Sequence, residues 1–187
     1  MRLFLAIDFA RDLRDALHHT TTPLRAAAPD VRWVSAERLH LTVKFLGEQT
    51  AEIESLLHPI MDAVAARHHR MDIALAGVGA FPSFRRARVV WIGVTPSVQL
   101  ARLYDDVDVA CERLGVPRET RAFRPHVTLG RVRPGTAPSR LRALALAAES
   151  VRVQGTATAE TLDLMESVTA GGEPRYVTLH RAPLERR

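Results

Sequence analysis

The chain of 187 residues is long enough for one domain or for two small lobes that share a core. Hydrophobic residues make up 47% and charged residues 25% of it, as in ordinary soluble proteins, and no apolar run approaches the roughly 18 residues of a membrane span. The apolar start meets acidic residues at Asp8 and Asp12, unlike a signal peptide. Cys111 is the single cysteine, so we expect a cytoplasmic protein without internal disulfides.

The formal net charge is +5, which favours anionic partners such as nucleotides or RNA. Lys44 is the only lysine, and the other basic residues are all arginines. Arginine suits phosphate oxygens and stacks on bases, but a general compositional bias of the genome would give the same excess.

Hydrophobic periodicity and turn residues predict alternating strands and helices along the whole chain. We expect strands at residues 2–9, 31–34, 40–46, 71–79, 87–95, 126–131, 151–167 and 175–181, the last two joined by a turn at 169–174. We expect helices at 11–27 with a break at Pro23, from the N-cap Thr50 to His69 with a kink at Pro59, from Pro96 to Leu114, and from about 140 to Glu149.

Two strands share a motif of histidine, any residue, and threonine. His40 and Thr42 open the first, and His126 and Thr128 open the second, after a loop at 116–124 that contains three arginines. Side chains at i and i+2 of a strand project from the same face, so each strand offers an imidazole beside a hydroxyl. One isolated histidine carries little information, whereas two histidines in the same local pattern predict one shared site.

The elements that follow the two histidines also agree in order, which suggests an old duplication with units that start near 40 and 126. Trp91 and Val177 stand at equal distances after their histidines. We therefore expect one domain over residues 1–187, an α+β fold with two pseudo-two-fold-related antiparallel sheets backed by helices and a central cleft. Equivalent strands could then face each other across that cleft.

Two imidazoles across a cleft suit a reaction that needs one general base and one general acid near neutral pH. Phosphodiester hydrolysis is such a reaction, and the hydroxyls of Thr42 and Thr128 could bind the non-bridging oxygens. We expect no metal and no cofactor, because these four groups cover proton transfer and charge.

Strand parity places Lys44 on the face of His40, where it could contact phosphate. Arg131 has the opposite parity and reaches the site only if the strand ends or bulges there. The phenylalanines and arginines in the segment from Phe81 to Arg86 allow two interpretations. They could stack on the bases of a ligand, or they could belong to a hairpin whose phenylalanines cap the core. Cys111 is interpreted as a small buried apolar group.

The stretches HLTVKFLGE and FRPHVTLGR resemble the two signatures of the 2H phosphoesterase superfamily, and within it the RNA 2',3'-cyclic phosphodiesterases, also called 2'-5' RNA ligases. RLFLAIDF, WVSAERLHLTVKFLGE, GVGAFPSFRRARVVWIGV and YVTLHRAPL extend the resemblance over nearly the whole chain. Ala87, where relatives often have proline, and Gly130, where alanine is common, depart from the family pattern.

The resemblance implies a bilobal fold and hydrolysis of RNA 2',3'-cyclic phosphate ends to 2'-phosphomonoesters, with reversible 2'-5' ligation. It implies that His40 is the proton donor and His126 the proton acceptor. As partners we expect RNA with 2',3'-cyclic phosphate ends, such as tRNA fragments, or small cyclic nucleotides, and we expect a monomer. Two alternatives stay open: a cyclic phosphodiesterase for a small nucleotide or ADP-ribose-type cyclic phosphate, and an RNA-end-binding module without catalysis.

Overall fold

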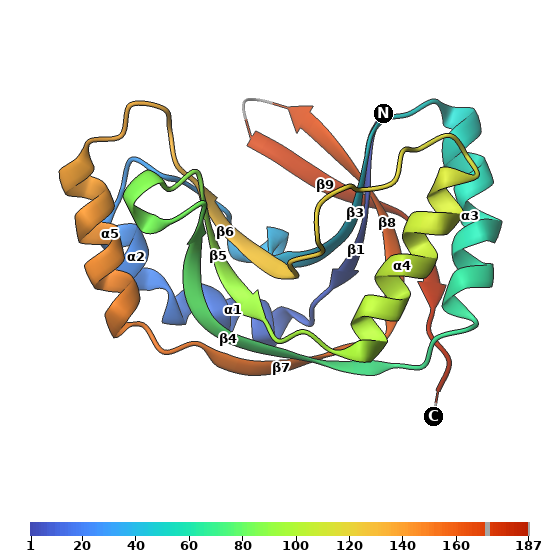
Figure 1. Cartoon of the computed structure of the whole chain (residues 1–187), viewed down its shortest axis with the longest axis horizontal. Helices are drawn as coiled ribbons and strands as arrows, with labels where there is room; N and C mark the ends of the chain where they lie inside the picture. The colour runs from blue at the N-terminus through green and yellow to red at the C-terminus, as the bar shows by residue number, and fades with distance from the viewer. Residues whose placement is uncertain (171–172, 187) are drawn as a thin grey trace.

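The computed structural model of the chain describes residues 1–170 and 173–186, so the middle of the expected turn at 169–174 lies outside the described residues. Within that range the chain forms one curled antiparallel sheet of nine strands with helices at both ends (Figure 1). The strands are β1 Arg2–Asp8, β2 Arg32–Trp33, β3 His40–Glu48, β4 Met71–Phe81, β5 Val89–Val94, β6 His126–Arg131, β7 Gln154–Ala159, β8 Thr161–Ala170 and β9 Glu173–Pro183. The α-helices are α1 Arg11–Thr20, α2 Thr22–Ala27, α3 Ala51–Ala65, α4 Val98–Glu112 and α5 Pro138–Ser150, and short 3-10 turns are η1 Ala36–Arg38 and η2 Phe84–Arg86.

The sheet divides into two lobes at the boundary between β6 and β3. The strand order is β7-β4-β5-β6-β3-β1-β8-β9, and β2 is added beside β6. β3 and β6 share one registered pair, Leu41 and Val127, both fully buried. The expected bilobal α+β fold is confirmed, and the two sheets prove to be joined edge to edge at this one place.

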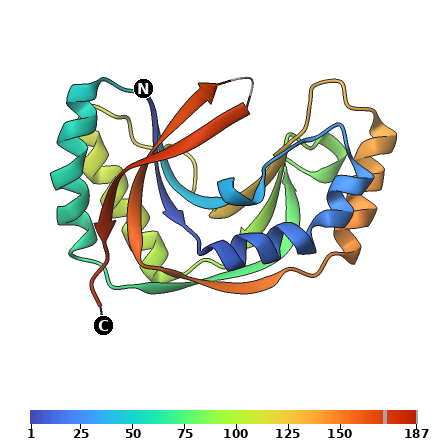
Figure 2. The same cartoon turned by 180° about the vertical axis from the view of Figure 1, so that it is seen from behind.

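Helices close the two ends of the molecule. The helices α2 and α5 pack together at one end, and α3 and α4 pack together at the other, as two opposite views show (Figure 1, Figure 2). The main core lies between the sheet and these helices, and a small second cluster of Phe4, Ala6 and Met165 lies apart from it. None of the helices in the described part of the chain has the length and apolar character needed to span a bilayer.

Side-chain caps fix two of the helix starts. The hydroxyl of Thr50 accepts a hydrogen bond from the backbone N–H of Ile53, as predicted. Ser97 does the same for Leu100, so α4 begins at Val98 and not at Pro96. The expected break near Pro23 separates α1 from α2, and α3 continues through Pro59.

The end of α3 differs from the prediction, since the helix stops at Ala65 and not at His69. Backbone hydrogen bonds to the C-terminal segment replace the last helical turn, because Arg70 N donates to Glu185 O and Glu185 N donates to His68 O. These partners are more than a hundred residues away in sequence, and local periodicity carries no sign of them.

The single strand expected at 151–167 is wrong. The structure has β7 and β8 there, divided at Glu160. β7 pairs with β4 in one lobe and β8 pairs with β1 in the other, so the chain crosses between lobes at this division. The buried parity changes across it, from Ala157 and Ala159 on β7 to Leu162 and Leu164 on β8, where the opposite face is also covered at Met165.

The pseudo-two-fold symmetry relates strands that hold equivalent positions in the sheet, not strands that follow the two histidines at equal distances along the chain. β5 lies beside β6, and the corresponding place beside β3 is held by β1, whereas β9 lies at the outer edge of its lobe. Trp91 on β5 and Val177 on β9 therefore hold different places in the sheet, although they follow their histidines at the same distance.

Candidate active site

The two His-x-Thr strands meet at the boundary between the lobes. Leu41 and Val127, the registered pair, point into the core. His40 and Thr42 flank Leu41, and His126 and Thr128 flank Val127. Because side chains alternate along a strand, all four project to the opposite face, where Thr42, His126 and Thr128 line a cleft of about 830 Å³. The structure thus brings the two predicted pairs together.

Backbone carbonyls orient both imidazoles in the same way. His40 Nδ1 lies 2.8 Å from Arg38 O, and His126 Nδ1 lies 2.7 Å from Arg124 O. A carbonyl oxygen only accepts, so Nδ1 carries the proton in each ring and Nε2 is left for chemistry. His40 Nε2 lies 3.0 Å from Thr42 Oγ1, which links His40 to the cleft wall.

The electrostatic surroundings of the two rings differ. Burial lowers the pKa of His40 from 6.5. The hydrogen bond to Arg38 O and the carboxylate of Asp8 oppose this effect, whereas the weaker influence of the Arg14 guanidinium adds to it. Burial also lowers the pKa of His126, where the bond to Arg124 O opposes the shift and the nearby charge of Arg131 adds to it. The strongest side-chain charge at each ring therefore favours the imidazolium at His40 and the neutral ring at His126.

Aromatic rings surround each histidine. The Phe4 and Tyr176 ring centroids lie 5.1 and 5.2 Å from the centroid of His40. Phe81 and Trp91 hold similar places around His126, at 5.0 and 6.4 Å. These contacts hold the rings in place and exclude water, in agreement with the lowered pKa values.

Both motif strands carry a bulge directly after the threonine. Val43 has no register partner on β1, because Leu5 pairs with Lys44 and Ala6 pairs with Thr42. Leu129 likewise has no register partner on β5. An extra residue reverses the alternation of the side chains that follow it.

The bulges change the surroundings of Lys44 and fulfil the condition under which Arg131 reaches the site. Lys44 borders the cleft but is only 6% exposed, and its Nζ donates to Asp108 Oδ1 at 2.5 Å and to Pro117 O at 2.9 Å, so its charge is already paired. Arg131 lines the cleft beside Thr128. Phe45, which is 65% exposed, holds the corresponding place on β3.

The residues of the hairpin from Phe81 to Arg86 divide between the cleft and the core. Phe81 lines the cleft, whereas Phe84 packs against the core, so the two interpretations of this hairpin each hold for one ring. Arg88, which follows the hairpin, lines the cleft where Arg85 and Arg86 do not.

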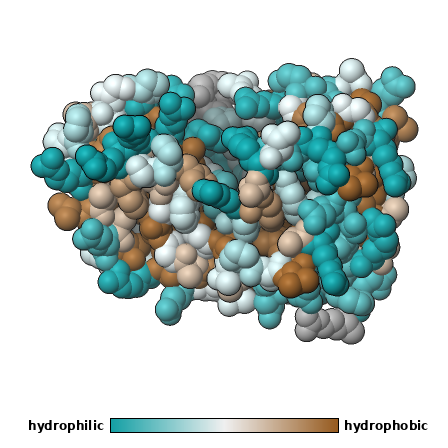
Figure 3. All heavy atoms as spheres, in the orientation of Figure 1, coloured by the Kyte–Doolittle hydropathy of each residue, from teal (hydrophilic) through white to brown (hydrophobic). Residues whose placement is uncertain are grey.

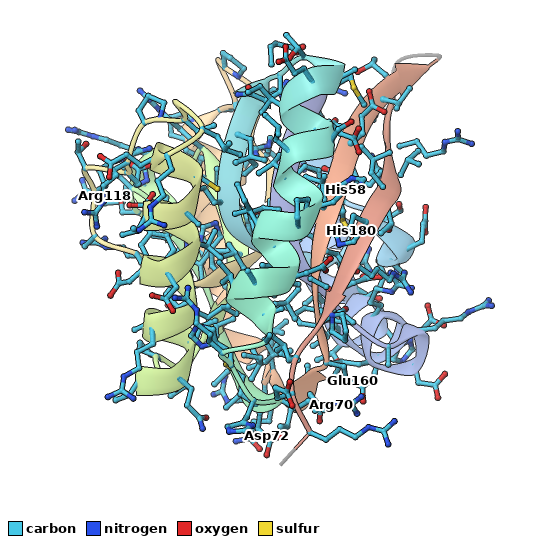
Figure 4. All side chains as sticks on the ribbon, turned by 90° about the vertical axis from the view of Figure 1, so that its right-hand side faces the viewer. His58, Arg70, Asp72, Arg118, Glu160 and His180 are labelled. Carbon is cyan, nitrogen blue, oxygen red and sulfur yellow. The ribbon has the colours of Figure 1, made fainter. Side chains whose placement is uncertain are left out.

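The cysteine and the other histidines lie outside the site. Burial raises the pKa of Cys111 to about 11, as expected for an unreactive thiol. His58 and His180 stack on each other beside α3, away from the cleft (Figure 4). Within the described residues, no group of three or more His, Cys, Asp or Glu side chains has the arrangement of a metal site.

Sequence reasoning missed several residues of the site. Asp8, Phe4, Trp91 and Tyr176 reach the histidines only through the pairing of strands, which a single sequence does not reveal. The three arginines of loop 116–124 are evident in the sequence, and the structure places all three in the lining of the cleft. In the space-filling view, hydrophilic side chains surround a hollow between the lobes (Figure 3).

Comparison with known proteins agrees with this geometry. The family model for the 2'-5' RNA ligase superfamily matches residues 12–170. A protein from Aeropyrum pernix named RNA 2',3'-cyclic phosphodiesterase is 31% identical over 90% of both chains. A protein of the same name from Geobacillus stearothermophilus is 33% identical over 75% of this chain, but the match spans only 45% of that protein.

Solved structures show the same fold. The protein TT0787 of Thermus thermophilus superposes with a TM-score of 0.82 at 26% identity and 98% coverage of both chains. LigT of E. coli, crystallised with 3'-AMP, gives a TM-score of 0.73 at 30% identity, with 98% of this chain and 97% of LigT covered. The chain therefore belongs to the 2'-5' RNA ligase superfamily of 2H phosphoesterases, as its two His-x-Thr motifs predict.

Proposed function

We propose that the chain hydrolyses 2',3'-cyclic phosphate ends of RNA to 2'-phosphomonoesters by acid and base catalysis with His40 and His126. The observation that carries this proposal is the pair of imidazoles at the lobe boundary, each fixed through Nδ1 and each beside a threonine. The names of the relatives and the nucleotide bound to LigT support an RNA end as the substrate.

In the proposed reaction, neutral His126 takes a proton from water through Nε2 while the water oxygen forms a bond to phosphorus. The bond from phosphorus to the 3' oxygen breaks, and protonated His40 donates the Nε2 proton to that oxygen. The products are a 2'-phosphate and a 3'-hydroxyl. The carboxylate of Asp8 near His40 and the charge of Arg131 near His126 favour this direction.

The threonines and Arg131 would stabilise the charge that builds up on the non-bridging oxygens. Hydroxyl groups at Thr42 and Thr128 line the cleft, and Arg131 adds a guanidinium there. Lys44 is assigned a supporting role, because Asp108 already holds its ammonium group. All of these groups come from one chain, which supports a monomer as the working unit.

Product analysis tests the proposal. We expect a 2',3'-cyclic-phosphate-ended oligonucleotide to give the 2'-phosphate, and we expect His40→Ala and His126→Ala each to lower kcat at least about a hundredfold. The activity should persist in EDTA. Full activity in either histidine variant, or a 3'-phosphate product, would overturn the assignment.

The same groups support 2'-5' ligation. If the 5'-hydroxyl of a second RNA replaces water, the same bond to the 3' oxygen breaks and a 2'-5' linkage forms, with the same proton transfers. Incubation of a cyclic-phosphate-ended RNA with a 5'-hydroxyl RNA should give a joined product that both histidine substitutions abolish. Joining that survives both substitutions would contradict a shared site.

A further inference from the structure

Loop 116–124, between α4 and β6, forms one wall of the cleft and is firmly anchored. Asp108 on α4 is 2% exposed and accepts hydrogen bonds from Lys44 Nζ, Arg118 Nε and Glu119 N, at 2.5, 3.0 and 3.2 Å. Burial alone would raise the pKa of Asp108, but these three hydrogen bonds outweigh that effect and hold the pKa below its ordinary value. The ionised carboxylate thus fixes the loop before any ligand arrives.

The cleft carries more positive charge than one cyclic phosphate needs. Among the described residues that line it, five are arginines and one, Glu119, is acidic. A 2',3'-cyclic phosphate has one negative charge, and Arg131 already lies beside Thr128 to meet it. Arg118 is paired with Asp108, so Arg121 and Arg124 of the loop remain for other phosphates.

Arg118 and Arg121 of the loop differ in their ion pairs and in their exposure to solvent. Arg118 binds Asp108, yet half of its side chain is exposed, and it projects on the side of α4 away from α3 (Figure 4). The Arg121 side chain is 85% exposed and forms an ion pair of 3.2 Å with Glu119. A phosphate could displace that carboxylate at little cost, because exposed ion pairs contribute little.

Aromatic rings lie between these arginines. Tyr104 on α4 and Phe123 on the loop stack with centroids 4.1 Å apart and an interplanar angle of 10°. Both rings line the cleft and also an adjoining cavity of about 340 Å³ between α4 and the loop. Rings beside backbone-binding cations are the usual means of holding single-stranded nucleic acid without base specificity.

We propose that loop 116–124 and Tyr104 form a subsite for the nucleotide on the 5' side of the cyclic end, with Arg121 on its phosphodiester and the Tyr104–Phe123 pair against its base. The inference rests on the proposed function and narrows the substrate class to RNA strands of two or more nucleotides. A mononucleotide or small cyclic phosphate would fill the catalytic end of the cleft and leave the loop end without a ligand.

The test compares adenosine 2',3'-cyclic phosphate with di- and trinucleotides that end in the same group. We expect kcat/KM to rise about tenfold or more from the mononucleotide to the dinucleotide, as one stacked base and one charged contact add to binding. Arg121→Ala should reduce this length ratio. Glu119→Gln, which removes the competing charge but keeps an oxygen acceptor, should increase it.

Arg142→Ala on the outer helix α5 makes the same change of charge away from the cleft and serves as the control. It should leave the length ratio unchanged. The salt dependence of kcat/KM for the dinucleotide should become shallower in Arg121→Ala by about 0.7 in the log–log slope, the value for one phosphate contact on a single strand.

Binding of 2'-phosphate-ended products, followed by fluorescence titration, separates this inference from the proposed function. Length-dependent binding that Arg121→Ala weakens, without any turnover, would overturn the proposed function and keep the subsite. Turnover with no dependence on length, or equal losses in Arg121→Ala and Arg142→Ala, would overturn the subsite alone.

Discussion

Asp8 on β1 lies directly opposite His40 on β3 in the antiparallel register. Asp8 Oδ1 accepts hydrogen bonds from Phe9 N at 2.9 Å and from Arg14 at 3.0 Å, so the carboxylate is held beside the imidazole. Glu37 and Arg38 of η1 are the other charged groups on the segment that leads into β3. The Arg38 carbonyl also helps to retain the His40 proton, because its hydrogen bond raises the pKa of the ring against the effect of burial.

The first prediction concerns Asp8→Asn. The amide keeps an oxygen for Phe9 and Arg14 but removes the charge that opposes the lowered pKa of His40. The alkaline limb of the kcat/KM profile, where the acid loses its proton, should move to lower pH, and kcat/KM at pH 7.5 should fall about threefold to tenfold.

Asp12→Asn, an exposed acid in the first turn of α1, is the matched control and should not move the limb. A shift of the acidic limb in Asp8→Asn would mean that His40 is the base, and the proposed direction would be wrong.

The second prediction concerns the pH dependence of the unmodified protein. Burial lowers the pKa of both His40 and His126 below 6.5, so the bell-shaped profile of kcat/KM, which reports the free enzyme, should have its maximum on the acid side of pH 6.5. A bound phosphate favours the imidazolium form, so the kcat profile should lie at higher pH. Initial rates from about pH 4.5 to 8.5 measure both, and a kcat/KM maximum above pH 6.5 would contradict the inferred burial.

The third prediction concerns the buried pair of Lys44 and Asp108. Lys44→Met should lower the free energy of unfolding by about 3 kcal/mol, because Asp108 loses a buried partner. Adding Asp108→Leu to Lys44→Met should recover part of that loss. Urea unfolding followed by fluorescence measures the change, and a large loss of kcat/KM at unaltered stability would show that Lys44 contacts the substrate instead.

The fourth prediction concerns Asp163, which is 1% exposed on β8 and whose two carboxylate oxygens have no hydrogen-bond partner among the described residues. Arg181 lies 3.5 Å away with a mostly exposed side chain. Burial raises the pKa of Asp163 above 3.8, although the nearby Thr161 hydroxyl and the charge of Arg181 oppose the shift. Asp163→Asn should therefore raise the free energy of unfolding at pH 7 by roughly 1 kcal/mol.

The sign of this effect follows from proton binding. Well below pH 3.8 the carboxyl is protonated in both states, so the advantage of the variant should shrink toward zero as the pH falls. As the pH rises from 3.8, the unfolded chain ionises first, so the folded state loses stability until the pH passes the raised pKa of the folded protein. Unfolding curves of the variant and of the unmodified protein at about pH 3.5 and about pH 7 measure the difference. A variant that is less stable than the unmodified protein at about pH 7 would refute the prediction.

The sequence allowed the four central residues to be predicted because their chemistry is written in local patterns. His40 and Thr42 are two apart, as are His126 and Thr128, and that spacing suffices to place each pair on one face. The lobes followed from the repetition of the pattern, together with the resemblance to a known family.

The burial of Lys44 against Asp108 has a specific physical cause that the sequence does not reveal. A single unpaired residue, Val43, reverses the alternation of β3, and no rule of local propensity locates a bulge in a half-buried strand. The division at Glu160 was missed for another reason, since the change of partner strand leaves only one sign in the sequence, the shift of the buried parity from Ala159 to Leu162. Asp8 and Trp91 became visible as neighbours of the histidines only when the register was known.

The carbonyls that hold the two imidazoles also limit where protons can go. Arg38 O and Arg124 O are weak bases and cannot take a proton from the ring. In the proposed mechanism each hydrolysis therefore ends with His126 charged and His40 neutral. This protonation state is the one that the reverse reaction requires, so the spent enzyme is primed for resynthesis of the cyclic ester until exchange with bulk water resets it.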